Sequence, residues 1–297
     1  MCSSDLKVAQ SVGFDRVVKL ARAAGLNNRI QPTPAVALGA YEVTPVEIAG
    51  AYTMFANRGI HADPFFLSMV RSKAGALLDV TYPRVRGVIG PEVAYVITTM
   101  LESVINHGTG AGARTRGFTA PAAGKTGSLS DGWFAGYTSN LITVVWVGYD
   151  DNRDLRLTGG AAALPIWTEF MKRAVALPGY SDVREVAPPD NPPDGAVVLE
   201  IDPASGELAT PACTGTITEF FIKGTEPTKV CHLHYRGEPE KLAAVPAAPA
   251  PAAEPEHVAA LPTEPAPFPS AVAATPVPPV TVPTKPLRSE EHTSELQ

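Results

Sequence analysis

Two consecutive β-type runs near the middle of the chain limit the folds open to it. Residues 132–138 and 141–149 are rich in aromatic and β-branched side chains, and only Ser139 and Asn140 separate them. Such a short connection is typical of an antiparallel hairpin. The run 141–147 is almost wholly apolar, which predicts that both of its faces are buried. The fold should therefore contain an antiparallel hairpin close to its core.

Helical patterns lie on both sides of this hairpin. A first helix is expected over residues 7–26, ending at Gly25. A second starts at the capping box Thr44-x-x-Glu47, with Pro45 at its first position. A third helix opens at Pro91, and a closing helix covers about 164–176. A short β excursion should fill residues 64–89. The side chains expected to face the core are Ile48, Ala51, Tyr52 and Phe55 in the second helix, Val93, Ile97, Leu101 and Val104 in the third, and Ile166, Trp167, Phe170, Met171 and Ala174 in the last.

Length and charge exclude some classes of protein. The 297 residues suffice for one large domain with appendages. The net charge is −6 and no basic stripe exists, so no nucleic-acid partner is expected. No apolar run approaches the ~20 residues of a membrane helix, and the start lacks the basic and apolar regions of a signal peptide.

The two ends of the chain differ in character from the rest. Residues 1–6 and 288–297 resemble translated sequencing adapters, so we expect them to be foreign and the chain to be part of a longer gene product. Residues 7–180 are expected to form the main folded region. Residues 181–237 predict a small β-rich accessory segment. Residues 238–287 are so rich in proline and alanine that we expect a disordered tail.

The leading candidate for chemistry is the run Gly124-Lys125-Thr126-Gly127-Ser128. A Lys-Thr-Gly triplet alone is a weak signal. This one follows a loop rich in glycine, alanine and proline, lies on an expected strand, and precedes the hairpin. That context is typical of the third motif of penicillin-binding proteins and serine β-lactamases.

The resemblance extends well beyond the triplet. The sequence is similar to class A penicillin-binding proteins over roughly residues 7–177, and the similarity is expected to continue to about residue 235. The segments that carry it are Ala37-Leu38-Gly39-Ala40-Tyr41-Glu42-Val43-Thr44-Pro45, Ala49-Gly50-Ala51-Tyr52, Phe55-Ala56-Asn57-Arg58-Gly59, Gly108-Thr109-Gly110, Trp133-Phe134-Ala135-Gly136-Tyr137 and Trp146-Val147-Gly148-Tyr149-Asp150-Asp151.

This resemblance implies a fold. The class is α/β: the penicillin-binding, serine β-lactamase-like transpeptidase fold, with an antiparallel sheet, five-stranded in the family, and helices on both faces. The chain would hold its C-terminal part, truncated at the N-terminal side, plus a small C-terminal extension.

The resemblance also gives each motif residue a role. Lys125 would place a positive charge near the substrate carboxylate and the proton-transfer network of a serine. The hydroxyls of Thr126 and Ser128 would bind that carboxylate. Gly127, which has no side chain, would let substrate backbone lie against the strand edge. The backbone N–H of Ser128 would be one donor of an oxyanion hole.

Two further motifs of the family, Ser-x-x-Lys with the nucleophile and Ser-x-Asn, are not present where they are needed. We therefore expect a D,D-transpeptidase of a bifunctional glycosyltransferase/transpeptidase, represented here by a stretch that cannot acylate by itself. The implied partners are peptidoglycan stem peptides ending in D-alanyl-D-alanine, and β-lactams. No cofactor is expected, the location would be extracytoplasmic, and any membrane anchor would belong to the missing N-terminal part.

Two alternatives remain open at this point. The first is a hydrolase of the same superfamily, either a D,D-carboxypeptidase or a β-lactamase. The second is a wall-binding protein without catalytic activity that kept the fold.

Two cysteines close together in the sequence form a separate candidate. Cys213 and Cys231 suit a disulfide in an oxidising compartment. Together with His232 and His234 they are also candidates for a zinc site, but the Cys-x-x-Cys spacing is missing. We favour the disulfide and expect no metal.

Overall fold

The computed structural model describes residues 3–234 of the chain. The expected tail at 238–287 and the end at 288–297 lie outside the described residues. Helix α1, Ser3–Val12, begins inside the six residues that we expected to be foreign.

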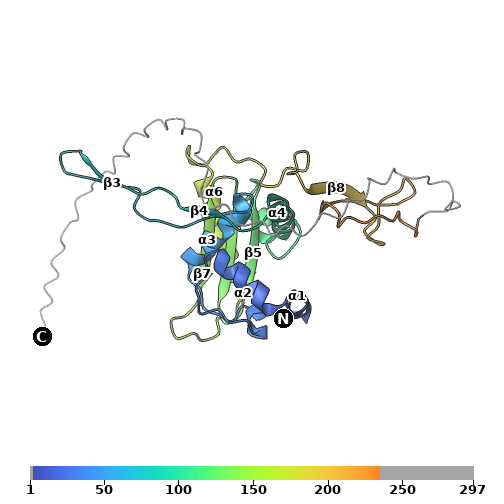
Figure 1. Cartoon of the computed structure of the whole chain (residues 1–297), viewed down its shortest axis with the longest axis horizontal. Coiled ribbons are helices and arrows are strands. Elements are labelled where there is room, and N and C mark those ends of the chain that lie inside the picture. Colours follow the sequence, from blue (N-terminus) through green and yellow to red (C-terminus); the bar gives the residue numbers. More distant parts are fainter. Residues whose placement is uncertain (1–2, 235–297) are drawn as a thin grey trace, which may run out of the picture. The chain divides into compact units, whose positions relative to one another are not determined.

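The central element is an antiparallel sheet of three strands (Figure 1), in the order β5 (Ala123–Ser128), β6 (Gly132–Tyr137) and β7 (Ile142–Val147). The expected hairpin is confirmed, because β6 pairs with β7 from Gly132 opposite Val147 to Tyr137 opposite Ile142. The expected strand around Lys125 is confirmed as β5.

The closing helix α6, Gly159–Ala174, covers one face of this sheet. Its fully buried Trp167 packs on Phe134 with ring centroids 4.8 Å apart. A Cβ atom added at Gly136 would lie 2.8 Å from the Trp167 ring, so the indole needs the glycine. We call this side, which carries Phe134 and Gly136, the α6 face. It holds the largest buried cluster among the described residues.

Helix α3, Pro45–Ala56, packs against the opposite face. Tyr137 of β6 contacts Tyr52 of α3 edge to face, and its hydroxyl lies 2.8 Å from Thr98 Oγ1 of helix α4, Pro91–Asn106. Helices therefore cover both faces of the antiparallel sheet, as the fold class predicted. We call this second side, which carries Trp133, Ala135 and Tyr137, the pocket face.

The first helix departs from its prediction. Residues 7–26 were expected to form one helix, but the structure has α1 and then α2, Phe14–Ala23. Gly13 separates them with a φ of +95°, a conformation that side chains disfavour. The following short helices are the 3₁₀ turn η1, Pro34–Leu38, and later α5, Gly112–Thr115.

The capping box of α3 is confirmed, with the Glu47 N–H donating to Thr44 Oγ1 and Thr44 N–H donating to the Glu47 carboxylate. Helix α6, in contrast, begins earlier than expected, because the Thr158 hydroxyl caps it by accepting from the Ala161 N–H. Pro165 is accommodated inside its second turn.

Several predicted buried faces were only partly right. In α6, Ile166 and Phe170 are about half exposed, whereas Ala163 and Leu164 are buried. In α4 none of the predicted residues is among the buried ones, which are Ala94, Tyr95, Val96, Thr98 and Ile105. In α3 the prediction of Ala51 is confirmed, and the other buried residues are Gly50 and Met54. Strand β7 is not buried on both faces, because each of its residues is at least partly exposed and Trp146 is 39% exposed.

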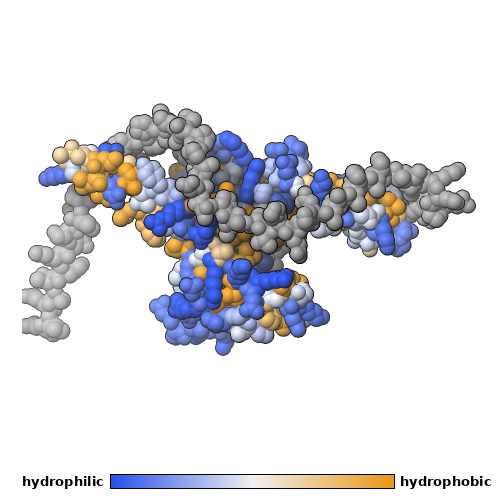
Figure 2. Space-filling view, viewed as in Figure 1, coloured by the Kyte–Doolittle hydropathy of each residue, from blue (hydrophilic) through white to orange (hydrophobic). Residues whose placement is uncertain are grey.

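The expected excursion at 64–89 is a pair of two-stranded ribbons. Strand β1, Ile60–Ala62, pairs with β4, Val85–Gly87, and β2, Met69–Arg71, pairs with β3, Leu77–Val80. Hydrophobic side chains gather on the surface around β2 and β3 (Figure 2). The exposed ones are Phe65, Phe66, Leu67, Met69, Val70, Leu77, Leu78 and Tyr82.

The expected accessory segment contains a β-hairpin, formed by β8, Ala196–Ile201, and β9, Ile217–Ile222. It rests on α4, where Tyr95 packs edge to face on Phe220. Within residues 3–234, no helix is long and apolar enough to cross a membrane.

One carboxyl group on α4 links stability to pH. Burial, helped by the nearby Glu185 and opposed by Arg114, raises the pKa of Glu102 to about 7. The folded state therefore holds a proton there that the unfolded chain releases near its ordinary pKa of 4.5. The stability due to protonated Glu102 is complete below that value and is lost as the pH rises to about 7.

A substitution of Gly136 tests the packing of the sheet on α6. We expect Gly136→Ala to lower the free energy of unfolding by about 1–3 kcal/mol, because the new methyl group overlaps the Trp167 ring. Gly179→Ala is the matched control, since nothing lies near its added Cβ, and it should change stability by less than about 0.5 kcal/mol. Denaturant unfolding of both variants measures the difference, and equal stabilities would contradict this packing.

A second variant tests the buried carboxyl group. Glu102→Gln should unfold like the unmodified chain at pH 4 and be more stable at pH 8, by about 1 kcal/mol after allowance for partial solvent screening. Thermal unfolding across this pH range measures it. Glu42→Gln, at an exposed position, should show no such gain. A Glu102→Gln curve parallel to that of the unmodified chain would count against the raised pKa.

Candidate active site

The predicted motif lies on β5, whose second edge pairs with no other strand among residues 3–234. Lys125 is opposite Ala135 and Gly127 is opposite Trp133, so both belong to the pocket face. Thr126, opposite Phe134, belongs to the α6 face. The free edge offers backbone groups to which an extended peptide can add as a further strand.

Hydrogen bonds hold the side chains of Lys125 and Thr126 in place. The exposed Lys125 donates from Nζ to the Thr126 carbonyl over 2.8 Å. The Thr126 hydroxyl lies 2.7 Å from that of Thr109, which belongs to the glycine-rich loop after α4. This loop therefore fixes the rotamer of Thr126 at the strand edge.

Helix α6 begins against the end of the motif. Gly159 N–H donates to Ser128 Oγ over 2.8 Å, which leaves the Ser128 hydroxyl proton free to be donated elsewhere. A Cβ at Gly159 would lie 2.3 Å from the Gly127 carbonyl oxygen, so only glycine permits this approach. The structure therefore brings the start of α6 into contact with Ser128.

A pocket of about 460 Å³ opens beside Lys125, Thr126, Gly127 and Ser128. Its other walls are mostly apolar and come from α2, η1 and α3 and the loops between them. These lining side chains include Val17, Ala21, Leu26, Ile30, Val36, Leu38, Ile48 and Tyr52. A concave apolar site with a few convergent polar groups is the usual form of a binding site.

Two indoles lie beside the β5–β6 turn, and one of them lines the pocket. Trp133 lines the pocket and lies 6.3 Å from Trp146, measured between ring centroids. Both indole N–H groups donate to the same oxygen, Oδ2 of Asp131, over 3.0 and 2.6 Å. In the sequence both tryptophans contribute only to the resemblance, and Asp131 belongs to none of the predicted site residues. An acidic residue two positions before a strand tryptophan was the available signal.

The pocket supplies no nucleophile with an adjacent base. Ser128 and Lys125 are its only lining serine and lysine, and both belong to the same strand. Burial raises the pKa of Tyr52 to about 12, so this phenol stays protonated at neutral pH. The sequence contains one Ser-x-x-Lys spacing, at Ser4 and Lys7, but both side chains are exposed on α1 and neither lines the pocket.

What this arrangement can do is bind an anion at the end of an extended peptide. Lys125 brings a positive charge, and Thr126 and Ser128 bring hydroxyls to the same edge. Covalent catalysis would also need a nucleophile with an adjacent base, which the described pocket does not contain.

The predicted disulfide is not formed in the structure. Cys213 and Cys231 are both free thiols, Cys213 partly exposed and Cys231 fully buried. They lie in the accessory segment, outside the residues that line the pocket.

Comparisons with known proteins agree with this geometry. The family model described as the penicillin binding protein transpeptidase domain matches residues 7–172. A second family model, the C-terminal domain of penicillin-binding protein 1A, matches residues 192–236.

Curated relatives and a solved structure give the same result. Penicillin-binding protein 1A of Aquifex aeolicus is 34% identical over 231 residues, which cover 76% of this chain and 30% of the relative. Penicillin-binding protein 2D of Bacillus subtilis is 33% identical, covering 82% of this chain and 35% of the relative. The crystal structure of penicillin-binding protein 1A from Haemophilus influenzae superposes with a TM-score of 0.66 at 26% identity, covering 76% of this chain and 39% of that one.

The chain thus spans about a third of the length of the curated relatives it matches. The transpeptidase model by itself matches more than half of the chain, and it includes the whole of β5 and the helices around the pocket. This chain therefore belongs to the penicillin-binding protein transpeptidase family.

Proposed function

We propose that the chain forms the Lys-Thr-Gly side of a serine D,D-transpeptidase site that cross-links peptidoglycan stem peptides. The observation that carries this proposal is the free edge of β5, where Lys125, Thr126 and Ser128 border an apolar pocket. Family membership supports it, and by resemblance Lys125, Thr126 and Gly127 would form the third motif of the family.

The proposed substrate is a stem peptide that ends in D-alanyl-D-alanine. Its backbone would pair with the free edge of β5, beside Gly127. Its terminal carboxylate would accept hydrogen bonds from the hydroxyls of Thr126 and Ser128, with Lys125 supplying the opposite charge. A β-lactam would place its own carboxylate in the same position.

The proposed reaction is acyl transfer. A serine hydroxyl attacks the penultimate D-alanine carbonyl, the peptide bond breaks, and terminal D-alanine leaves with the serine proton on its new amino group. An amine of a neighbouring stem peptide then attacks the acyl ester, forms the cross-link and releases the serine. The oxyanion of each step would be stabilised by the Ser128 backbone N–H.

By resemblance to the family, the serine and its lysine base come from the Ser-x-x-Lys motif, with Ser-x-Asn beside it. Neither motif lines the described pocket. We propose an extracytoplasmic location, because the peptidoglycan substrate is assembled outside the cytoplasmic membrane. The membrane anchor and the glycosyltransferase activity would belong to the parent protein.

The chain by itself should not form a covalent adduct with penicillin. Incubation of the 297-residue chain with a fluorescent penicillin, followed by denaturing electrophoresis, is expected to leave it unlabelled. The reason is that no serine in the pocket has an adjacent base. A labelled band that is lost in Ser128→Ala or Ser4→Ala would contradict this assignment.

A chimera tests the function itself. Residues 7–234 would replace the matching segment of penicillin-binding protein 1A from Pseudomonas aeruginosa, which is 31% identical to this chain. By resemblance to the family, the rest of that protein would supply the remaining motifs. We expect the chimera to be acylated by fluorescent penicillin, and Lys125→Ala to slow acylation by about 10²–10³-fold, as loss of a charged transition-state contact does.

The matched control is Lys73→Ala, which removes an exposed lysine from the turn between β2 and β3. It should leave the acylation rate unchanged. Equal rates for Lys125→Ala and Lys73→Ala would refute the proposed role of the strand. Product analysis with a stem-peptide donor and acceptor separates cross-linking from hydrolysis, and hydrolysis alone would favour a carboxypeptidase.

A further inference from the structure

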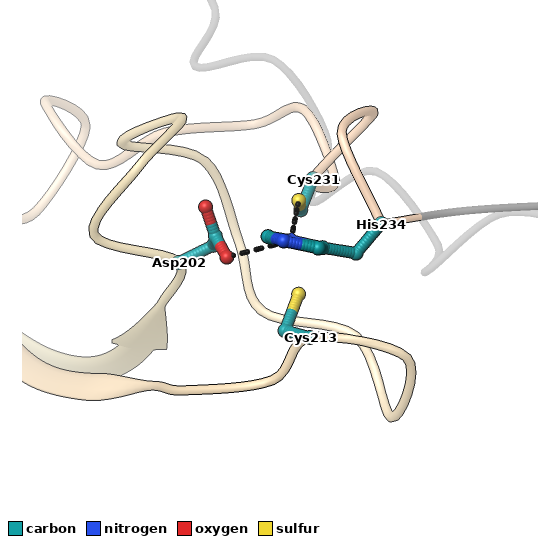
Figure 3. A group of neighbouring side chains, drawn as sticks. All are labelled: Asp202, Cys213, Cys231 and His234. Carbon is teal, nitrogen blue, oxygen red and sulfur yellow. Dashed lines mark hydrogen bonds and ion pairs between the residues drawn. The ribbon is translucent and has the colours of Figure 1, made fainter.

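Four side chains of the accessory segment direct their ligand atoms toward one point (Figure 3). They are Asp202, Cys213, Cys231 and His234, and one oxygen, two sulfurs and one imidazole nitrogen all lie within 4.8 Å of one another. They come from three stretches of chain: the turn that follows β8, the loop before β9, and the end of the described residues. The fold thus gathers residues 32 positions apart in the sequence, from 202 to 234.

Nδ1 of His234 has two possible hydrogen-bond acceptors close to it but can carry only one hydrogen. Its Nδ1 lies 2.9 Å from Asp202 Oδ2 and 3.4 Å from Cys231 Sγ. A nitrogen with one hydrogen can donate to only one of these two acceptors. A cation at the common point would instead accept a lone pair from all three atoms.

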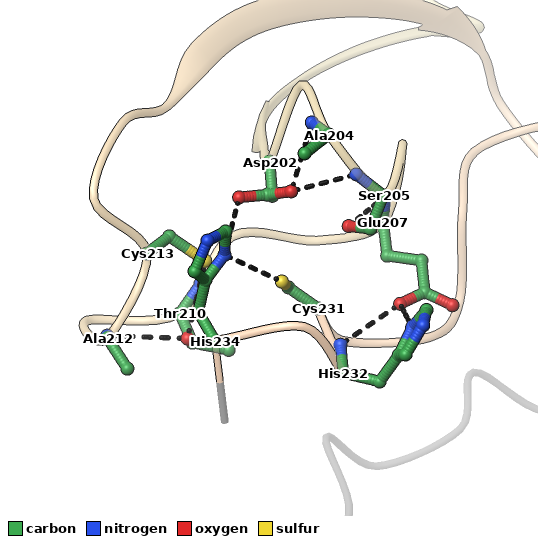
Figure 4. A network of polar contacts seen from close by, with 10 residues as sticks. All are labelled: Asp202, Ala204, Ser205, Glu207, Thr210, Ala212, Cys213, Cys231, His232 and His234. Carbon is green, nitrogen blue, oxygen red and sulfur yellow. Dashed lines mark hydrogen bonds and ion pairs between the residues drawn. The ribbon is translucent and has the colours of Figure 1, made fainter. Parts of the chain in front are cut away.

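A second layer of contacts orients the ligands (Figure 4). The other carboxylate oxygen of Asp202 accepts from the N–H groups of Ala204 and Ser205, which leaves Oδ2 directed at the cluster. The Thr210 N–H lies 3.3 Å from Cys213 Sγ, a contact that suits a thiolate. Such outer contacts fix the direction of metal ligands.

The neighbouring histidine shows which side chains belong to the cluster. His232 points away from it, and its Nδ1 bonds to Glu207 Oε2 over 2.6 Å. The spacing that remains, Cys231-x-x-His234, places two ligands on a single turn of chain. From the sequence alone we favoured a disulfide and did not consider Asp202, which is 29 residues before Cys231 and becomes its neighbour only through the fold.

We propose that Asp202, Cys213, Cys231 and His234 bind a structural zinc ion. Two thiolates and an imidazole favour zinc over magnesium or calcium, which prefer oxygen ligands. Tetrahedral zinc holds such atoms about 3.3–3.8 Å apart, so they need move by only about 1 Å or less. Four protein ligands leave no open position, which indicates a structural site.

A bound zinc ion would stabilise the accessory segment. Its hairpin contributes little buried apolar surface, and Asp202 and Cys231 are both fully buried at its end. A buried carboxylate is costly unless it is paired, and a small domain without a large core depends on cross-links or metals. All four residues fall inside the separate family match at 192–236.

Metal analysis of the whole chain tests the proposal. The protein, expressed in zinc-supplemented medium and purified without chelator, should contain about one zinc ion per chain. Replacement by Co²⁺ should give the intense visible bands of tetrahedral cobalt and a sulfur-to-cobalt charge-transfer band in the near ultraviolet. The cobalt spectrum uses the unmodified chain and so does not depend on whether a variant folds.

Variants assign the ligands. Cys213→Ser, Cys231→Ser and His234→Ala should each weaken zinc affinity by at least ~10-fold, and Asp202→Asn should do the same. His232→Ala is the matched control, since it removes a histidine of the same loop that points away, and its affinity should be unchanged. Zinc should also protect Cys213 and Cys231, but not Cys2, from alkylation.

Either of two results would overturn the proposal. The first is a chain that contains no zinc, gives no tetrahedral cobalt spectrum and gains no protection of its thiols. The second is a disulfide between Cys213 and Cys231 in peptide maps of protein exported across the cytoplasmic membrane. Neither result would bear on Lys125, because the four residues lie outside the pocket of the proposed transpeptidase site.

Discussion

The contact between Trp167 and the glycine-bearing strand β6 is the constraint on which the rest of the structure depends. Gly136 lets the indole approach the sheet closely, and Phe134 packs against it. Because the tryptophan fixes where α6 crosses the sheet, it also fixes where that helix begins. The N-terminus of α6 then meets the Gly127–Ser128 end of β5, and Gly159 permits the approach. A core contact thereby sets the position of the candidate site.

One face of the central sheet packs in the core, and the other face lines the pocket. Around Phe134 and Trp167 the α6 face is closed and apolar, so this part supplies the stability that a three-stranded sheet needs. The pocket face carries Lys125 and Trp133 and opens into a space walled by apolar side chains. Alternation along a strand assigns each residue to one face or the other. Lys125 can therefore stay exposed while its neighbours Gly124 and Phe134 are buried.

Much of this could be predicted from the sequence, since local signals carry it. The Ser139-Asn140 connection indicated the hairpin, and the Thr44–Glu47 box indicated the start of α3. Most of the failures depend on contacts between distant residues. The half exposure of Ile166 and Phe170 follows from which neighbours the sheet provides. The break at Gly13 is the exception, because a local backbone angle causes it. Asp202 joins the two cysteines only because β8 ends beside them. The periodicity of hydrophobic residues and the spacing of motifs do not reveal such contacts between distant residues.

The central claim is that the free edge of β5 binds the carboxylate end of the substrate. A crystal structure of the penicillin-acylated chimera tests it most directly. The account predicts that the bound carboxylate lies within hydrogen-bond distance of the Thr126 and Ser128 hydroxyls, with Lys125 Nζ close by. It also predicts that the acyl amide pairs with the edge of β5. A carboxylate directed toward solvent, with the β5 edge unoccupied, would contradict it.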